Sequence, residues 1–227
     1  MNAPLLIGAA LGMRHGTDPD HLAAIDGLTR IRPRNTNGIF FALGHGLVVM
    51  ILAVGLGHMI SDRLTFLGPW TLILIGAINL YRIVRGAPPT APMKRLPVAQ
   101  PFLLGMILAA GFETASQLSA LLLAGKTNAW LLGISFSFGM VLVDGVDGYL
   151  AASTQRRAVT GETNAVQASR LLGLLVVIFS FGLGGAELLG FDLDRYGLAM
   201  GIGLFATVIA IRVWARSPAR SSLAQAA

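Results

Sequence analysis

Apolar residues along the chain fall into seven long runs separated by short polar stretches. A transmembrane helix needs about 20 mostly apolar residues, and each run reaches or approaches that length. We therefore predict an all-α fold, a polytopic membrane helix bundle of about seven transmembrane helices in a single domain, residues 1–227. The predicted spans are 4–28, 39–60, 67–84, 101–123, 130–152, 168–189 and 196–214.

Lysine and arginine residues are distributed unevenly between the two ends of these spans. Thirteen lie in loops or helix ends on one side, three lie in the loops on the other, and Arg14 lies inside the first span. Short loops rich in lysine and arginine stay on the cytoplasmic side of a membrane. The pattern predicts a multi-pass protein of the cytoplasmic membrane, with the N-terminus outside and the C-terminus in the cytoplasm.

Several spans contain ionisable side chains, which are costly in hydrocarbon. A charge at the bilayer centre costs about 2.5–3.5 kcal/mol even on the most permissive insertion scale. A single buried Asp or His is often only a contact between helices, but a cluster of them indicates function. The polar residues within the first five spans include Arg14, His15, Asp18, Asp20, His21, Asp26, His45, Asn79, Glu113, Asp144 and Asp147.

The first span carries the densest cluster, RHGTDPDH. In a continuous helix His15 and Asp18 share a face, whereas His21 lies about 240° around the axis from His15. Pro19 predicts a break, with Asp18 as the N-cap of a second half-helix. Irregular backbone at membrane depth is tolerated only where it is buried in protein or lines a wet cavity. Because broken helices form the substrate sites of many transporters, we expect these side chains to line a site.

The composition supports a membrane protein and limits its chemistry. Hydrophobic residues make up 54% of the chain and charged residues 12%, about half the charge usual in soluble domains. Without cysteine, disulfides and thiolate metal sites are excluded. The basic residues behind the net charge of +6 lie between apolar spans, so we expect a lipid bilayer and no nucleic acid as partner. No basic segment precedes the first apolar run, so no cleavable signal peptide is expected.

The candidate donor groups are imidazoles and carboxylates. Mixed nitrogen and oxygen sets suit divalent Ni, Co, Cu and Zn, whereas oxygen-only sets suit Mg and Ca. A carboxylate can also orient a ligating histidine from behind. The residues therefore predict a transition-metal site, and a path for protons or sodium ions stays open as the alternative.

Four motifs, in order along the chain, resemble the nickel/cobalt transporter (NiCoT) permeases. RHGTDPDHL resembles the family signature with its HxxxxDH pattern, and FFALGHGLVV resembles its Phe-Phe-x-Leu-Gly-His stretch. AGFETASQ and FSFGMVLVDGVDG resemble two further acidic motifs, and Asn79 stands where the family has an asparagine. The chain is similar to a short, urease-accessory-like form, because the signature falls in the first predicted helix rather than the second.

The resemblance implies transport of Ni(II) or Co(II), with the ion as substrate and no cofactor. The implied metal-binding residues are His15, Asp18, Asp20, His21 and His45. The implied supporting or relay residues are Arg14, Asn79, Glu113, Asp144 and Asp147. Arg14 is expected to pair with an aspartate rather than to touch the metal. Pro19, Glu113, Gln117 and Gly145 replace residues usual in the family, which leaves the preferred metal open.

We predict a secondary permease that works in the uptake direction. The chain has no G-x-x-x-x-G-K-[ST] motif, so the energy must come from the membrane potential, a counter-ion gradient or another subunit. Metal efflux by proton exchange and a non-transporting accessory membrane subunit stay as alternatives, and the oligomeric state stays open. An enzyme is not expected, because neither H-E-x-x-H nor G-x-S-x-G is present.

Overall fold

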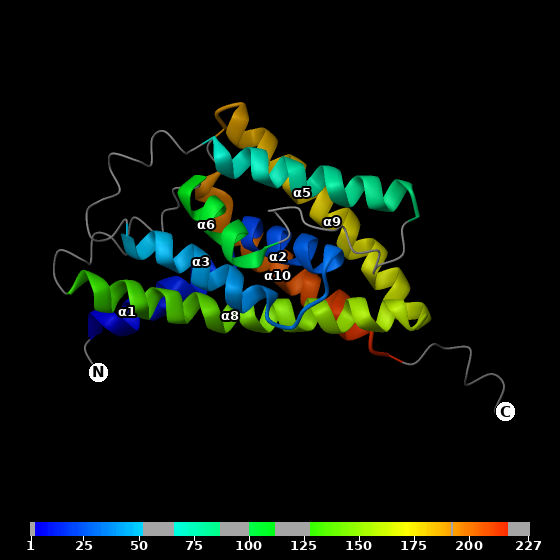
Figure 1. Ribbon diagram of the computed structural model, residues 1–227, viewed down its shortest axis with the longest axis horizontal. Helices are drawn as coiled ribbons and strands as arrows, with labels where there is room; N and C mark the ends of the chain where they lie inside the picture. The colour runs from blue at the N-terminus through cyan, green and yellow to red at the C-terminus, as the bar shows by residue number, and fades with distance from the viewer. Residues whose placement is uncertain (1–2, 52–65, 87–99, 112–127, 192, 218–227) are drawn as a thin grey trace.

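The computed structural model describes residues 3–51, 66–86, 100–111, 128–191 and 193–217 (Figure 1). All regular structure within these residues is α-helical, which confirms the predicted fold class. The helices are α1 (Ala3–His15), α2 (Pro19–Ile31), α3 (Asn37–Ile51), α5 (Leu67–Val84), α6 (Pro101–Gly111), α8 (Ala129–Val159), α9 (Thr163–Leu188) and α10 (Asp194–Trp214).

The architecture is that of a polytopic membrane helix bundle. Among the described residues, α5, α8, α9 and α10 are long and apolar enough to cross a membrane. Helices α3 and α6 are shorter apolar helices, and the predicted spans 39–60 and 101–123 continue from them into residues outside the described ranges. The total of seven spans therefore stays a prediction.

The first predicted span is broken where Pro19 indicated. Helix α1 ends at His15, and α2 begins at Pro19. Asp18 occupies the N-cap position with φ −62° and ψ 144°, the extended backbone expected before a proline. Its side chain makes no capping hydrogen bond and instead accepts one from His15. The Asp18 carboxylate therefore binds His15 instead of capping the N-terminus of α2.

The connection between α8 and α9 is shorter than predicted. Helix α8 continues to Val159 and α9 begins at Thr163, so both helices extend beyond the predicted span ends at 152 and 168. With 31 residues, α8 is about 46 Å long and extends past a hydrocarbon core of about 30 Å, where polar residues continue the helix at no cost. Gly161, with φ of 84°, provides the left-handed backbone for the sharp reversal.

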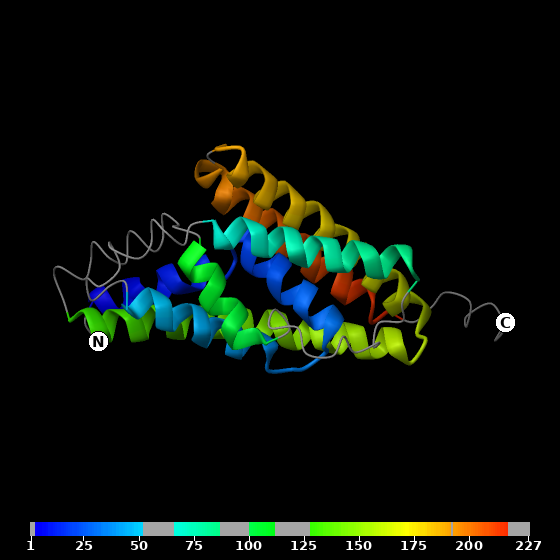
Figure 2. The same cartoon turned by 45° about the horizontal axis from the view of Figure 1, so that its top comes forward.

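Helix α2 lies in the middle of the bundle (Figures 1 and 2). It packs against α3, α5, α8, α9 and α10, and all of its 13 residues are buried. Its buried polar side chains are Asp20, His21, Asp26, Thr29 and Arg30. A polar helix enclosed by apolar ones is expected of a membrane transporter, because ionisable groups at membrane depth face the interior of the bundle.

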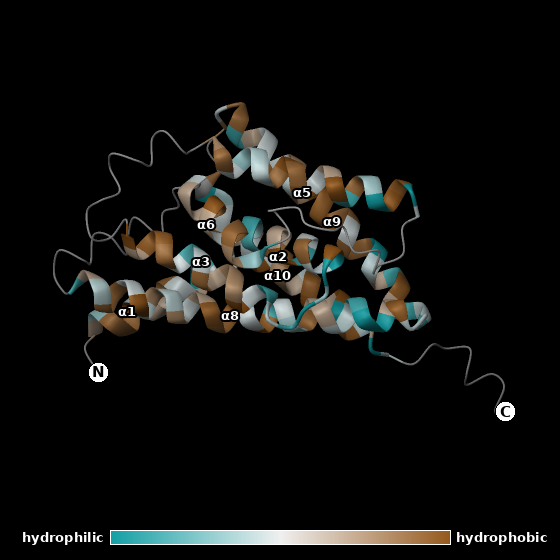
Figure 3. Ribbon diagram, in the orientation of Figure 1, coloured by the Kyte–Doolittle hydropathy of each residue, from teal (hydrophilic) through white to brown (hydrophobic). Residues whose placement is uncertain are grey.

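The outer helices expose large apolar side chains instead. Trp70 of α5, Ile134 of α8 and Ile178 of α9 are more than half exposed. Brown, the colour of hydrophobic residues, dominates the outer helices in Figure 3. This surface suits contact with lipid, which agrees with the low charge of the sequence.

Glycines allow the helices around α2 to approach one another closely. A Cβ atom added to Gly12 of α1 would lie 1.9 Å from the carbonyl oxygen of Phe136 in α8. A Cβ atom added to Gly139 of α8 would lie 2.0 Å from the carbonyl oxygen of Ala9 in α1. Small residues on both helices let transmembrane backbones touch. This crossing holds α1, and with it the first part of the polar cluster, against α8.

Candidate metal-binding site

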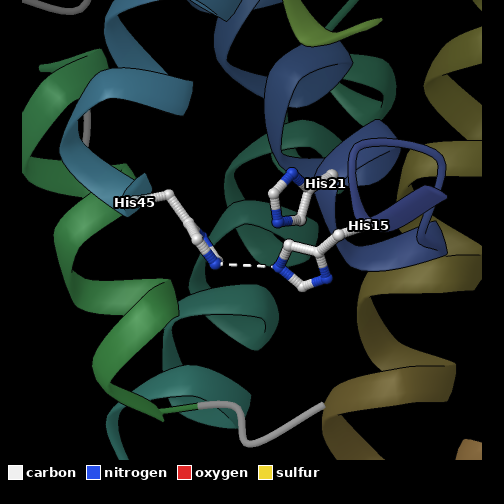
Figure 4. A group of neighbouring side chains, drawn as sticks. All are labelled: His15, His21 and His45. Atoms are coloured by element: carbon white, nitrogen blue, oxygen red, sulfur yellow. Dashed lines mark hydrogen bonds between the residues drawn. The ribbon is translucent and has the colours of Figure 1, made fainter. Parts of the chain in front are cut away.

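Three histidines from three helices meet inside the bundle (Figure 4). His15 ends α1, His21 lies in the first turn of α2, and His45 lies in α3. One ring nitrogen from each lies within 4.8 Å of the other two, and all three side chains are fully buried. In the part of the chain that the structure describes, these residues form the one group of His, Asp and Glu side chains arranged to hold a metal ion.

The break between α1 and α2 brings the first two histidines together. Their ring centroids lie 4.5 Å apart, although six residues would separate them widely around a continuous helix. The amide of Asp18 donates to the carbonyl oxygen of His15 at 2.9 Å and closes the turn. Gly201 of α10 packs on this turn, and a Cβ atom there would lie 2.5 Å from the carbonyl oxygen of Thr17. The kink is therefore stabilised by a hydrogen bond within the turn and by the packing of α10 against it.

Two aspartates orient the imidazoles. His15 Nδ1 donates to Asp18 Oδ2 at 2.9 Å, and His21 Nδ1 donates to Asp144 Oδ2 at 3.1 Å. A hydrogen bond of this kind fixes the proton on Nδ1, raises the basicity of the ring and leaves the Nε2 lone pair for a metal. Among the described residues, His21 Nε2 has no hydrogen-bond partner.

His15 and His45 face each other through their Nε2 atoms, 2.9 Å apart. Two ring nitrogens at this distance share one proton. Because His15 already donates from Nδ1, the shared proton belongs to His45. A cation bound by both rings must displace that proton, since only a nitrogen lone pair can ligate a metal.

Asp20 and Arg14 flank the histidines. Asp20 is 6% exposed, and its Oδ2 has no hydrogen-bond partner among the described residues. Arg14 Nη2 lies 3.9 Å from Asp18 Oδ1, so Arg14 pairs with an aspartate, as the sequence indicated. A buried carboxylate oxygen without a donor is costly and attracts a cation.

Aromatic rings complete the surroundings of the histidines. The centroid of the Phe136 ring lies 5.5 Å from that of His15, and the centroid of the Phe41 ring lies 5.0 Å from that of His21. Apolar rings exclude water and strengthen the electrostatic interactions beside them. The donor set is rich in nitrogen and backed by carboxylates, and so suits borderline divalent ions such as Ni(II) and Co(II) better than Mg(II) or Ca(II).

The remaining predicted residues divide among three places. Asp144 joins the site through His21. Asn79 Oδ1 accepts a hydrogen bond from Arg30 Nε at 3.2 Å, in a network toward the end of α2. Asp147 accepts a hydrogen bond from Arg212. Glu113 lies outside the described residues.

Sequence reasoning missed Arg212 as an interior group. The charge pattern places it among the loop and helix-end charges, because it closes an apolar run near other basic residues. It does lie in the last turn of α10, but it faces the interior of the bundle rather than water. Its side chain is buried, and its guanidinium lies between Asp26 and Asp147. The sequence did contain a signal for a buried cation, because Asp26 and Asp147 lie inside predicted spans and had no cationic partner assigned to them.

Comparisons with known proteins find nickel and cobalt transport proteins. A family model described as high-affinity nickel-transport protein matches residues 5–67, which include all three clustered histidines. The hydrogenase nickel incorporation protein HupN of Bradyrhizobium diazoefficiens is 29% identical, over 88% of this chain and 67% of that protein. The high-affinity nickel transport protein of Cupriavidus necator is 27% identical, over 86% of this chain and 73% of that protein.

A shorter similarity concerns a cobalt protein. The cobalt transport protein NhlF of Rhodococcus rhodochrous is 46% identical over 22% of this chain and 15% of that protein. No solved structure matches the chain.

Proposed function

The chain is a relative of the nickel/cobalt transporters, and we propose that it carries Ni(II) or Co(II) into the cell as a secondary permease. The resemblance indicated by the four motifs is confirmed, and the chain is a multi-pass membrane transporter rather than an enzyme. The ion is the transported substrate and not a resident cofactor.

One observation carries the proposal. Three fully buried imidazoles offer ring nitrogens within 4.8 Å of one another at a helix break inside an apolar bundle. The cluster leaves His21 Nε2 buried without a hydrogen-bond partner among the described residues, which is costly unless that nitrogen binds an ion. We infer that His15, His21 and His45 are the primary ligands. Asp18 and Asp144 then hold the imidazoles from behind, and Asp20 supplies further negative charge.

The charges around the site favour a dication. The carboxylates of Asp18 and Asp144 behind two of the imidazoles, with Asp20 beside them, give a negative environment in which a doubly charged ion gains more than a singly charged one. Sodium lacks the affinity for nitrogen ligands that Ni(II) and Co(II) possess. The three-histidine cluster therefore supports a transition-metal substrate over the alternative of a sodium path.

The membrane potential is the simplest driving force for uptake. Moving a dication through 100 mV is worth about 4.6 kcal/mol, at about 2.3 kcal/mol per charge. A potential that is negative inside the cell favours entry of the dication, which supports uptake over export.

We infer that residues 1–227 form one permease domain in the cytoplasmic membrane, with the C-terminus inside. Helices α2, α5, α8 and α10 end, and α9 begins, toward the same end of the bundle (Figures 1 and 2). The last turns of these four ending helices carry basic residues, namely Arg30, Arg82, Arg156, Arg157 and Arg212. Arg30, Arg82 and Arg212 are buried, so the number of basic residues that face water on this side falls by three, and the remaining excess still supports this orientation.

Accumulation of radiolabelled nickel and cobalt in cells tests the function. Cells that express the chain should accumulate more label than cells with an empty vector, and His21→Ala should reduce accumulation to the background. Glu162→Gln is a suitable control, because Glu162 is exposed and pairs with Arg157 at the surface. Lower accumulation than in empty cells would instead support efflux, and equal accumulation at equal expression would support an accessory subunit.

A further inference from the structure

A second charged cluster lies beside the three histidines. Arg212 of α10 donates from Nη1 to Asp147 Oδ1 at 2.6 Å and from Nη2 to Asp26 Oδ1 at 2.8 Å. Arg212 is 1% exposed, Asp26 is 3% exposed and Asp147 is fully buried. The triad joins α2, α8 and α10, and binding of an ion by the histidines does not use it.

The triad continues the two helices that form the histidine site. Asp26 follows His21 by five residues on α2, and Asp147 follows Asp144 by three residues on α8. With a rise of about 1.5 Å per residue, these residues lie about 7.5 Å and about 4.5 Å farther along their helices. Both helices run toward the end of the bundle at which the basic residues gather (Figures 1 and 2). An ion that leaves His21 in that direction therefore meets Asp26 and Asp147 next.

The triad is incompletely satisfied. Two carboxylates and one guanidinium carry a net negative charge at full burial. Among the described residues, Asp26 Oδ2 and Asp147 Oδ2 have no hydrogen-bond partner. Asp26 also borders a small cavity of about 10 Å³ between α2, α9 and α10, with otherwise apolar walls. A buried ion pair that serves only stability needs its remaining oxygens satisfied, since its desolvation is otherwise uncompensated.

We propose that Asp26 and Asp147 form the second binding position of the transported dication, and that the Arg212 guanidinium holds this position between transport events. The inference rests on the proposed transport of Ni(II) or Co(II). Arginine is permanently charged, so its guanidinium balances one of the two carboxylate charges without the uptake of a proton. The arriving dication ligates the free Oδ2 atoms and displaces the guanidinium from at least one carboxylate, because it interacts with each more strongly than a single delocalised charge does. The return of Arg212 then releases the ion toward the basic end of the bundle.

The number of ions bound by the purified full-length chain tests the proposal. Equilibrium dialysis with radiolabelled nickel is expected to give one ion for the wild type and none for His21→Ala. Arg212→Gln removes the tethered cation and is expected to bind two ions, while His21→Ala combined with Arg212→Gln binds one. That last ion should be lost again when Asp26→Asn and Asp147→Asn are added. A merely structural arginine would create no new metal site.

Transport in proteoliposomes gives the second readout. Arg212→Gln should slow nickel transport by about tenfold or more, the size typical of coupling between two sites, because the ion is retained at the second position. Arg212→Lys keeps the positive charge and should recover part of the rate. Arg157→Gln is the matched control, since Arg157 is exposed toward Glu162, and it should behave as wild type. One bound ion together with wild-type transport in Arg212→Gln would overturn the proposal.

A charge-matched variant covers the case in which Arg212→Gln does not fold. Asp26→Asn with Arg212→Gln keeps the net charge of the triad, and it should bind one ion at the histidines but transport it at least about tenfold more slowly. Wild-type transport in this variant, or failure of Arg212→Lys itself to fold, would reduce the triad to a structural element and overturn the inference. If the wild type neither binds nor transports nickel, the proposed function fails instead.

Discussion

His21 and Asp144 are 123 residues apart in the sequence, yet His21 Nδ1 donates to Asp144 Oδ2 at 3.1 Å, with both side chains fully buried. This bond joins the half-helix α2 to the long helix α8. It therefore couples an imidazole at the helix break to the element that also contacts α1 and α3. Asp144 therefore ties the orientation of His21, the proposed metal ligand, to α8.

Removal of the charge of Asp144 should weaken metal binding without removing a ligand. Asp144→Asn keeps an oxygen that accepts from His21 Nδ1 but loses the negative charge that raises the basicity of the ring. Loss of such a partner behind a ligating histidine typically costs about 10–100-fold in metal affinity. Isothermal titration of the purified chain with Ni(II) measures the change. Glu162→Gln, which removes an exposed carboxylate, serves as control. Wild-type nickel affinity in Asp144→Asn would show that Asp144 does not contribute to metal binding.

The nitrogen-rich donor set should decide which ions compete for transport. Excess Co(II), Cu(II) or Zn(II) is expected to suppress uptake of labelled Ni(II), because imidazole ligands suit all four ions. Excess Mg(II) or Ca(II) should not, since both prefer oxygen ligands. Uptake in the presence of each unlabelled ion measures the order. Suppression by magnesium at the same concentration as cobalt would indicate an oxygen site instead of His15, His21 and His45.

The broken first helix and the polar side chains on both sides of the break could be predicted from local sequence. Pro19 excludes a continuous helix, and RHGTDPDH places imidazoles on both sides of the break. Apolar run lengths also located α5 and α10 within two residues of their observed ends. The end of α8 could not be found in the same way, because hydrophobicity reports where the lipid ends and not where the helix ends.

Hydrogen-bond partners that come from distant helices could not be predicted from the sequence. Nothing local to Asp144 or Asp147 says that one accepts from His21 and the other from Arg212, although the two aspartates are only three residues apart. That choice depends on how α2 and α10 pack on α8. Arg212 was misassigned for the same reason, since a basic residue at the end of an apolar run has the same sequence pattern whether it faces water or a buried carboxylate.

Asn79 should contribute to stability and not to metal affinity. It is fully buried, accepts from Arg30 Nε at 3.2 Å and donates to the carbonyl oxygen of Ile75 at 2.9 Å. Asn79→Ala leaves a buried guanidinium with one fewer acceptor, which typically costs about 1–3 kcal/mol. The melting temperature in detergent should fall while nickel affinity stays at the wild-type value. A loss of affinity at unchanged melting temperature would assign Asn79 to a relay instead.

The crossing of α1 and α8 gives a direct test of the packing that supports His15. In Gly139→Ala the new methyl group would lie 2.0 Å from the carbonyl oxygen of Ala9, closer than any real contact, so α1 must move away. Such overpacking typically costs about 1–3 kcal/mol, and a displaced α1 also moves His15, so both the melting temperature and the nickel affinity should fall.

Gly203→Ala is the matched control for that crossing, because it makes the same substitution within α10. A Cβ atom at Gly203 meets nothing within 4 Å. In a helix interior alanine is more favourable than glycine by about 0.5–1 kcal/mol, so Gly203→Ala should melt at or above the wild-type temperature with unchanged nickel affinity. If Gly139→Ala and Gly203→Ala melted alike, α1 and α8 would not be in backbone contact. His15 would then owe its position to the turn at Asp18 and to Gly201 alone.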